Sequence, residues 1–235
     1  MSKCKKDTIK CPKCGREIEI DVWENIDLPY DAEQKKRVLK NSLFKVNCAD
    51  CRIIFPIAYR CQYNDMERKY LIWFAPRAEE TERKAIAAYN QKLKTDKPLQ
   101  LAQGGYRYRI VFNDNELREK VLIFDEGLDD RYIETMKISY LPLLQKNLTE
   151  DEAKILGIYF DKKEDGKYRW VIVFDRKQAV AVDIDMNMYE DMKIKLKDIV
   201  EEKTPEGLAQ ISAHWAWSVM QAKVAENQPE NENKE

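Results

Sequence analysis

This chain of 235 residues is constrained most by two CxxC motifs, Cys11-Pro12-Lys13-Cys14 and Cys48-Ala49-Asp50-Cys51. The spacing within each motif allows two thiolates to bind one side of a metal ion, so the two motifs together supply four soft ligands. Gly15 follows the first motif, where the turn favours a residue that accepts a positive φ, whereas Arg52 follows the second motif. The pattern predicts a tetrahedral zinc site formed by Cys11, Cys14, Cys48 and Cys51.

We expect this zinc to be structural. Four protein ligands leave no coordination position for water or substrate, whereas a catalytic zinc normally keeps one position open. Two alternatives stay open. The pairs could act as redox dithiols, because the CxxC motif lowers the pKa of a thiol, although no thioredoxin-like βαβ pattern surrounds them. The site could also hold iron, as rubredoxin-type sites do.

The charge balance and the absence of long apolar runs narrow the class of protein. The chain has 41 basic and 42 acidic residues, so it carries no overall charge that would attract DNA or an anionic membrane. No apolar run reaches the roughly 18 residues of a membrane span, and from the basic N-terminal residues we expect no signal segment. We therefore expect a cytoplasmic protein, in which paired cysteines bind metal rather than form disulfides.

Two cysteines lie outside the motifs. Cys61 is part of an apolar, strand-like run, and we expect it to be a small core residue. Cys4 is expected to be a terminal thiol, with a spare metal ligand as the alternative.

The first part of the chain alternates apolar and charged residues in the manner of strands. The expected strands are 18–26, 43–46, 52–63 and 68–74, and the expected helices begin at Asp31 and span 79–93. Asn64-Asp65 favours a tight turn that would join the last two strands in a hairpin. Pro98 and Gly104-Gly105 mark 95–105 as a linker. We expect a first domain at 1–97, in which 33 residues separate the cysteine pairs and fold back to join them.

A second domain is expected at 98–222, followed by a disordered polar tail at 223–235. Its strands are predicted at 106–112, 155–161, 167–174 and 179–185, and its helices at 115–124, from Asp129 or Asp130 onward, at 190–202 and at 207–222. Asn113 or Asp114 can cap the first of these helices. The fold class is therefore α+β: an N-terminal zinc-ribbon-like unit with a β-hairpin, then a second α+β unit of antiparallel strands with flanking helices.

Four segments resemble the CpXC domain family. They are the two cysteine motifs, the turn Tyr63-Asn64-Asp65-Met66-Glu67-Arg68-Lys69, and the run from Asn115-Glu116-Leu117-Arg118-Glu119-Lys120 to Gly127-Leu128-Asp129-Asp130-Arg131. The resemblance extends over residues 10–137, and the second cysteine motif departs from the family by lacking its proline. It implies a zinc-ribbon-like domain of bacteria or archaea whose family function is unassigned, so no catalytic residue can be carried over.

Candidate catalytic groups are few. The best set is acidic and could converge from two helices for acid–base or divalent-metal chemistry, although helix capping and exposed ion pairs are the alternative. Its members are Glu116, Glu119, Asp125, Asp129, Asp130 and Glu134, with Arg131 beside them. His214 is the single histidine, which excludes HExxH sites and His-based triads, and we expect it to pack on an apolar helix. Trp215 and Trp217 face different sides of that helix, which makes it a candidate partner or dimer contact.

Basic residues surround the first cysteine motif. They are Lys3, Lys5, Lys6, Lys10, Lys13 and Arg16. These cations could touch nucleic acid, or they could offset the net charge of −2 of zinc with four thiolates. The predicted function is a non-enzymatic, zinc-binding module whose surface binds another protein. The alternatives are an enzyme that uses the carboxylate set and a zinc ribbon that binds nucleic acid. No membrane partner is expected.

Overall fold

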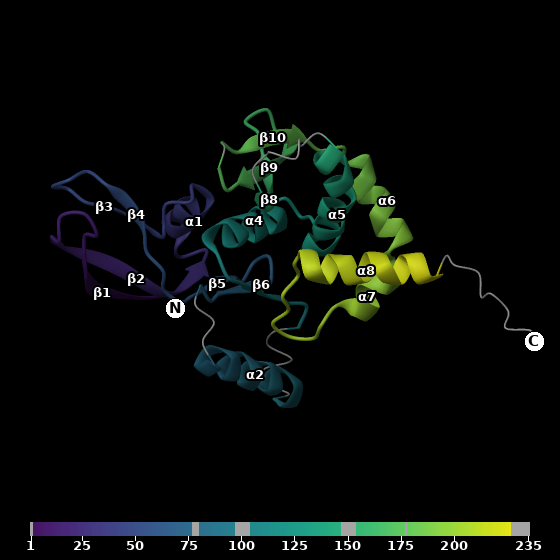
Figure 1. Ribbon diagram of the computed structural model, residues 1–235. Coiled ribbons are helices and arrows are strands. Elements are labelled where there is room, and N and C mark those ends of the chain that lie inside the picture. Colours follow the sequence, from purple (N-terminus) through teal and green to yellow (C-terminus); the bar gives the residue numbers. More distant parts are fainter. Residues whose placement is uncertain (1, 77–79, 97–103, 147–153, 177, 227–235) are drawn as a thin grey trace, which may run out of the picture. The chain divides into compact units, whose positions relative to one another are not determined.

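The structure is a computed structural model that describes residues 2–76, 80–96, 104–146, 154–176 and 178–226 (Figure 1). It confirms the α+β class, with helices placed between groups of strands and the cysteine motifs among the N-terminal strands. The chain forms two compact units. The first contains Met1–Asp125 and Glu206–Ala209, and the second contains Glu126–Pro205 and Gln210–Glu235.

The first unit is built on a mixed sheet. Its described strands are β1 (Lys3–Lys10), β2 (Glu17–Leu28), β3 (Lys45–Asn47), β4 (Ile54–Pro56), β5 (Cys61–Asp65), β6 (Tyr70–Phe74) and β7 (Arg107–Val111). Its described helices are α1 (Ala32–Leu39), α2 (Glu80–Thr95) and α4 (Asp114–Asp125). The five-stranded sheet has the order β1-β2-β5-β6-β7, in which β2–β5 and β6–β7 are parallel and the other neighbours antiparallel.

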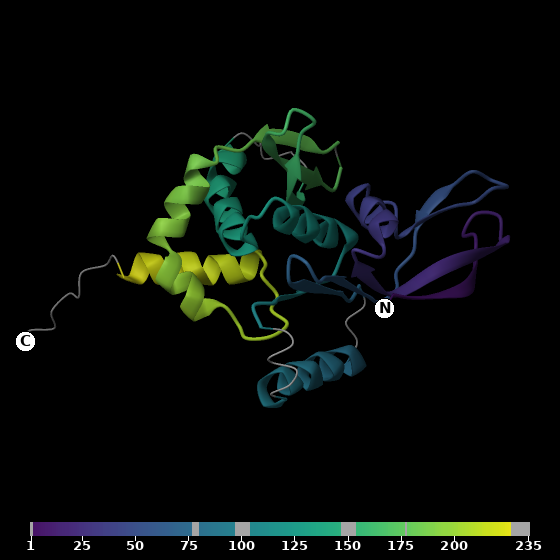
Figure 2. The same cartoon turned by 180° about the vertical axis from the view of Figure 1, so that it is seen from behind.

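A separate antiparallel hairpin is formed by β3 and β4. The two opposite views show this hairpin and the β1–β2 hairpin side by side, with both extending away from α4 (Figures 1 and 2). The turn of each hairpin carries one cysteine motif. The sheet therefore supports two arms whose tips hold the predicted metal ligands.

The strand β1 was not predicted from the sequence, because lysines interrupt its apolar pattern. It pairs with β2 along its whole length. Lys3 and Lys5 reach Glu24 at 2.5 and 3.1 Å, and Lys6 reaches Asp21 at 2.8 Å. Cross-strand pairs of opposite charge stabilise an antiparallel ladder. Lysines along an edge strand also discourage pairing with other chains.

The strand predicted at 52–63 is in fact two strands. β4 pairs with β3, whereas β5 pairs with β2 and β6 in the main sheet. Residues 57–60 carry the chain from one to the other, and the N–H of Ile57 donates to the carbonyl of Phe44 (2.9 Å). Residues 53–59 form one continuous apolar run, so the apolar pattern gives no sign of the break.

The helix α4 covers part of the main sheet. Leu117 and Val121 are buried on the face that packs against β6 and β7. The side chain of Asn113 accepts a hydrogen bond from the N–H of Glu116 (2.9 Å), and the Glu116 carboxylate accepts one from the N–H of Phe112 (2.8 Å). This arrangement is close to a capping box and confirms the helix start predicted at Asn113 or Asp114.

The domain boundary near residue 98 stays a prediction. Of the linker expected at 95–105, residues 97–103 lie outside the part of the chain that the structure describes. The strand β7, which follows it, pairs in parallel with β6 in the sheet of the first unit.

The second unit combines a small sheet with a group of helices. Its described strands are β8 (Ile155–Lys162), β9 (Tyr168–Phe174) and β10 (Val180–Asp183), and its described helices are α5 (Asp130–Lys146), α6 (Asn187–Lys195), α7 (Lys197–Lys203) and α8 (Ala213–Glu226). The sheet has the order β10-β9-β8 and is antiparallel, as predicted. The helix α5 packs against α6 and α8, and α7 packs against α8. Met136, Phe160 and Trp170 are fully buried in the core of this unit.

Two predicted helices have different bounds in the structure. The helix predicted at 190–202 is two helices, α6 and α7, which meet at the buried Leu196. The helix predicted at 207–222 begins only at Ala213, because the preceding chain runs beside β7, where the N–H of Ala209 donates to the carbonyl of Tyr108 (3.3 Å). Of the predicted tail, 223–226 are the last turn of α8 and 227–235 lie outside the described residues. None of the described helices has both the length and the apolar composition to cross a membrane.

Candidate metal centre

The two cysteine motifs fold into turns with the same backbone hydrogen bonds. In each turn the N–H of the first cysteine donates to the carbonyl five residues further on (2.8 Å from Cys11 and 3.0 Å from Cys48). The N–H of the residue after the second cysteine donates back to the carbonyl of the first (3.0 Å from Gly15 and 2.9 Å from Arg52). Gly15 and Arg52 both have a positive φ, +74° and +56°. The irregular second motif therefore adopts the same turn as the first, at the expense of backbone strain at Arg52.

This difference between the turns predicts opposite effects of two substitutions. Gly15→Ala should lower the free energy of unfolding by about 1 kcal/mol, because a residue with a Cβ is disfavoured at positive φ. No atom lies within 4 Å of the added Cβ, so the backbone alone accounts for the effect. Arg52→Gly should raise the same free energy by less than about 1 kcal/mol, because glycine also gains entropy in the unfolded chain. Urea denaturation of the metal-bound protein measures both, and a change of the same sign in both variants would contradict the prediction.

The two turns bring all four thiols of the motifs together. The Sγ atoms of Cys11 and Cys51 are 3.5 Å apart, those of Cys14 and Cys48 are 3.6 Å apart, and all four lie within 4.8 Å of one another. A tetrahedral zinc with bonds of about 2.3 Å separates its sulfurs by about 3.8 Å, so these donors fit the ion. The distances are too long for disulfides, whose sulfurs lie about 2.05 Å apart, and the four thiols are free. The four cysteines thus form a cluster that can hold a metal ion.

Close packing also perturbs the ionisation of these thiols. Burial raises the pKa of Cys11, but the backbone N–H groups of Cys14 and Lys13 and the neighbouring thiols outweigh burial and lower the pKa to about 6. The N–H of Arg16 lowers the pKa of Cys14, but burial and the other three thiols raise it to about 12. The first thiolate is therefore stabilised in the cluster, whereas further thiolates repel one another. A bound divalent cation offsets this repulsion.

The charged groups near the cluster pair with one another. Arg16 of the first turn forms an ion pair with Asp50 of the second turn, which adds a polar link between the two tips. Lys3, Lys5 and Lys6 of β1 form ion pairs with carboxylates of β2, which offsets much of their charge within the hairpin. Cys4 is exposed on β1 and lies outside the cluster. Cys61 is buried in β5, as predicted, and burial raises the pKa of its thiol.

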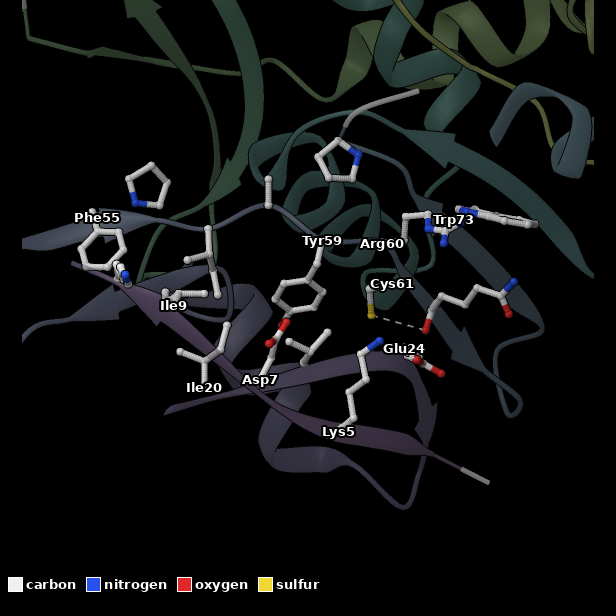
Figure 3. Close-up of a pocket in the computed structure, with 17 residues that line it drawn as sticks. Lys5, Asp7, Ile9, Ile20, Glu24, Phe55, Tyr59, Arg60, Cys61 and Trp73 are labelled. Carbon is white, nitrogen blue, oxygen red and sulfur yellow. Dashed lines mark hydrogen bonds and ion pairs between the residues drawn. The ribbon is translucent and has the colours of Figure 1, made fainter. Parts of the chain in front are cut away.

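A groove of about 950 Å³ lies between the β1–β2 hairpin and residues 55–62 (Figure 3). Its apolar wall includes Ile9, Ile20, Val22, Phe55, Tyr59 and Trp73. Its charged side chains are Lys5, Asp7, Lys10, Glu24 and Arg60. The close-up shows Tyr59 extending from one wall toward Asp7 and Ile20 of the hairpin, with Phe55 near one end and Trp73 near the other. The sequence did not predict this groove, because it depends on the unpredicted strand β1 and on the break between β4 and β5.

A cluster of charged residues that the sequence also did not predict holds the β5–β6 turn. Asp65 accepts a hydrogen bond from the N–H of Arg68 (2.9 Å) and lies 3.3 Å from its guanidinium. Lys35 of α1 lies 2.6 Å from Asp125, at the end of α4, and 4.0 Å from Asp65. The hydroxyl of Tyr70 is 3.5 Å from Asp125. These contacts join α1, the β5–β6 hairpin and α4. The sequence feature that pointed to them was the turn at 63–69.

Three of the acidic residues predicted as a candidate catalytic set make contacts that serve the fold. Glu116 caps the start of α4, whereas Asp125 pairs with Lys35 at its end (2.6 Å). Asp129 pairs with Arg131 (2.7 Å) in the second unit. The remaining members are buried: Glu119, Asp130 and Glu134. Within the described ranges, no set of three or more carboxylates lies close enough to hold a metal ion.

The last helix agrees only in part with its prediction. His214 is exposed, so the prediction that it packs on an apolar face is wrong. Trp215 is buried and donates its indole N–H to the carbonyl of Lys203 (2.8 Å), whereas Trp217 is 53% exposed. The two tryptophans therefore face different sides of α8, as expected.

Comparison with known proteins places the metal centre within a family. The family model of the CpXC protein matches residues 9–137. This range contains both cysteine motifs, the β5–β6 turn and α4. No curated protein and no solved structure matches the chain. Because the match covers more than half of the chain and includes all four clustered cysteines, this chain belongs to the CpXC family.

Proposed function

We propose that Cys11, Cys14, Cys48 and Cys51 bind one Zn²⁺ in a structural role, and that the chain is a non-enzymatic module that binds a partner protein. The sulfur-only donors and their spacing support zinc. Free thiols of this kind persist in a reducing compartment, which supports a cytoplasmic location.

Zinc would act on the two hairpins. When bound, it supplies four bonds that hold the tips of the β1–β2 and β3–β4 hairpins at a fixed separation. The β3–β4 hairpin is short, with three residues in each strand, and has little core of its own. Small elements of this kind commonly depend on a metal for their stability. The zinc would thereby fix one end of the groove that lies between the β1–β2 hairpin and residues 55–62.

The proposal of a protein partner rests on the groove. Aliphatic and aromatic side chains line its length, and its volume of about 950 Å³ accommodates several side chains of an extended segment. Its charges are mixed: Lys5 forms an ion pair with Glu24 (3.1 Å), and Asp7 faces the same space as Lys10. A polypeptide with apolar side chains and both signs of charge is complementary to such a lining.

A nucleic acid is complementary to this lining to a smaller extent. Asp7 and Glu24 would repel phosphates, and Lys3, Lys5 and Lys6 pair with carboxylates of β2. Of the carboxylates predicted as an enzyme site, Glu116 caps α4, Asp125 pairs with Lys35 and Asp129 pairs with Arg131. We therefore propose a polypeptide ligand rather than a polyanion or a reacting substrate.

A peptide selection tests this proposal. The zinc-loaded chain should select linear peptides from a random dodecapeptide library, and fluorescence anisotropy should show that they bind reversibly. Phe55→Glu, which introduces a charge into the apolar wall, should weaken their binding at least about tenfold. Ile54→Glu is the matched control, because Ile54 is the neighbouring residue, is 65% exposed and does not line the groove.

Three outcomes would contradict the proposal. They are a selection that yields no binding peptide, peptides that bind both variants equally, and a short single-stranded oligothymidine that binds more tightly than any peptide. Binding of the oligothymidine that falls steeply with added salt would instead identify phosphates as the ligand.

A further inference from the structure

The outer edge of the main sheet is covered by a segment from a distant part of the chain. β7 is the last strand of the five-stranded sheet, and Glu206–Ala209, which we call the return segment, lies along its outer edge. The N–H of Ala209 donates to the carbonyl of Tyr108 (3.3 Å), and the N–H of Ile110 donates to the carbonyl of Ala209 (3.1 Å). These two bonds form one rung of a parallel ladder with β7. Leu208 and Ala209 are buried in this position.

The helix α2 holds the same segment from a second side. The Oδ1 atom of Asn90 accepts a hydrogen bond from the N–H of Leu208 (2.8 Å). The neighbouring Tyr89 places the helix, because its ring contacts the rings of Trp73 and Tyr108, with centroids 6.0 and 6.2 Å away. β7 and α2 of the first unit therefore bind the return segment together.

The contact with α2 requires a glycine at position 207. Gly207 has a φ of +76°, at which a side chain is disfavoured. A Cβ added there would lie 2.5 Å from the Oδ1 atom of Asn90, which is closer than van der Waals contact allows. The preceding Glu206 forms an ion pair with Lys94 (3.0 Å), and both side chains are mostly exposed, so this pair contributes little. The shape of the site, more than its charge, determines which segment fits.

The two sides of this contact belong to different parts of the sequence. The family match at residues 9–137 contains β7 and α2 and ends before the return segment. The intervening residues Glu126–Pro205 belong to the second unit. Without the later residues, the first unit would present the open edge of β7, and an open edge is a template for pairing with another strand. A polypeptide segment is therefore the ligand that this edge fits.

We propose that β7 and α2 form a strand-addition site for a segment of the type glutamate–glycine–leucine–alanine, and that the return segment occupies this site in cis. In strand addition, main-chain hydrogen bonds give affinity and the side-chain positions give specificity. A tethered segment competes at an effective concentration on the order of millimolar, so a similar segment of another polypeptide binds only when the return segment is displaced. The site is separate from the groove, whose lining includes no residue of β7 or α2.

A labelled peptide of residues 204–212 tests this proposal on the full zinc-loaded chain by fluorescence anisotropy. Gly207→Ala should displace the return segment, so the peptide should bind this variant at least about tenfold more tightly than it binds the wild type. A peptide with alanine in place of its glycine should bind the variant at least about tenfold more weakly, because of the clash with Asn90. Gly166→Ala is the matched control: Gly166 has a φ of +84°, but no atom lies within 4 Å of an added Cβ. This control should bind as little peptide as the wild type.

Amide hydrogen exchange at Ile110 tests the proposal even if the Gly207→Ala chain does not fold. Asn90→Ala leaves the sequence of the return segment unchanged but removes the acceptor for its main chain. The N–H of Ile110, which donates to the return segment, should then exchange at least about tenfold faster. The N–H of Ala75 should keep its protection, because it donates to Val111 on the inner edge of β7 (2.9 Å).

Phe55→Glu, introduced together with Gly207→Ala, separates this site from the groove. It should leave the binding of the 204–212 peptide unchanged, and a loss of binding would place the peptide in the groove and overturn the proposal. Equal binding of the peptide to the wild type and to Gly207→Ala, or equal binding of the glycine and alanine peptides, would also overturn it. So would unchanged exchange at Ile110 in Asn90→Ala.

Discussion

Replacement of Cys48 and Cys51 by serine should abolish metal binding and unfold the tips of both hairpins. The four Sγ atoms lie within 4.8 Å of one another, so loss of two leaves half of a tetrahedral site. Structural zinc sites contribute on the order of 10 kcal/mol of binding free energy, which the short β3–β4 hairpin cannot replace. Elemental analysis should find about one zinc per wild-type chain and none in the variant.

Amide hydrogen exchange would localise the effect. Protection should be lost from β3, β4 and the part of β2 near the first motif. It should persist in α4 and β6, whose buried side chains do not depend on the metal. Cys4→Ser is the matched control, since Cys4 is exposed and lies outside the cluster, and it should keep both metal and fold. A wild type that is metal-free yet folded at the tips would contradict a structural metal and favour redox dithiols. If elemental analysis found iron in the wild type, iron would take the place of zinc in the proposal.

Asp65→Ala should lower the free energy of unfolding by about 3 kcal/mol. Asp65 is only 1% exposed, accepts the N–H of Arg68 and lies close to two cations, Arg68 and Lys35. Removal of a buried carboxylate leaves its partners without their counter-charge, which costs about 3–5 kcal/mol for fully buried pairs. The expected cost is at the lower end, because the side chain of Arg68 is 43% exposed and solvent screens part of its charge.

Asp165→Ala provides the matched control for this effect. Asp165 also accepts a backbone N–H in a hairpin turn, from Lys167 (3.0 Å), but its side chain is 50% exposed. Its replacement should cost less than about 1 kcal/mol, since water can take the place of the lost acceptor. Chemical denaturation with both variants in the zinc-loaded form measures the difference. Equal costs at Asp65 and Asp165 would indicate that the buried cluster contributes no more than an ordinary turn.

The sequence predicted those parts of the molecule that depend on local spacing. The two CxxC motifs were enough to predict that the four cysteines cluster. Asn113 and the spacing of the apolar residues that follow it were enough to predict α4. The parts that depend on distant residues were not predicted. Lys35 and Asp125 are 90 positions apart and meet only after α1 packs on α4. The strand β1 owes its place to pairing with β2, which outweighs its weak intrinsic preference for a strand.

The separation of the two cysteine pairs has a thermodynamic consequence. Residues 15–47 form a loop that a bound metal would close, and a covalent cross-link of that span would stabilise a fold by about 4 kcal/mol through chain entropy. A metal cross-link differs because unfolding releases it. Its contribution then grows by about 1.4 kcal/mol for each tenfold rise in free metal above the dissociation constant. The persistence of the closed hairpin tips would therefore depend on the free zinc of the surrounding compartment.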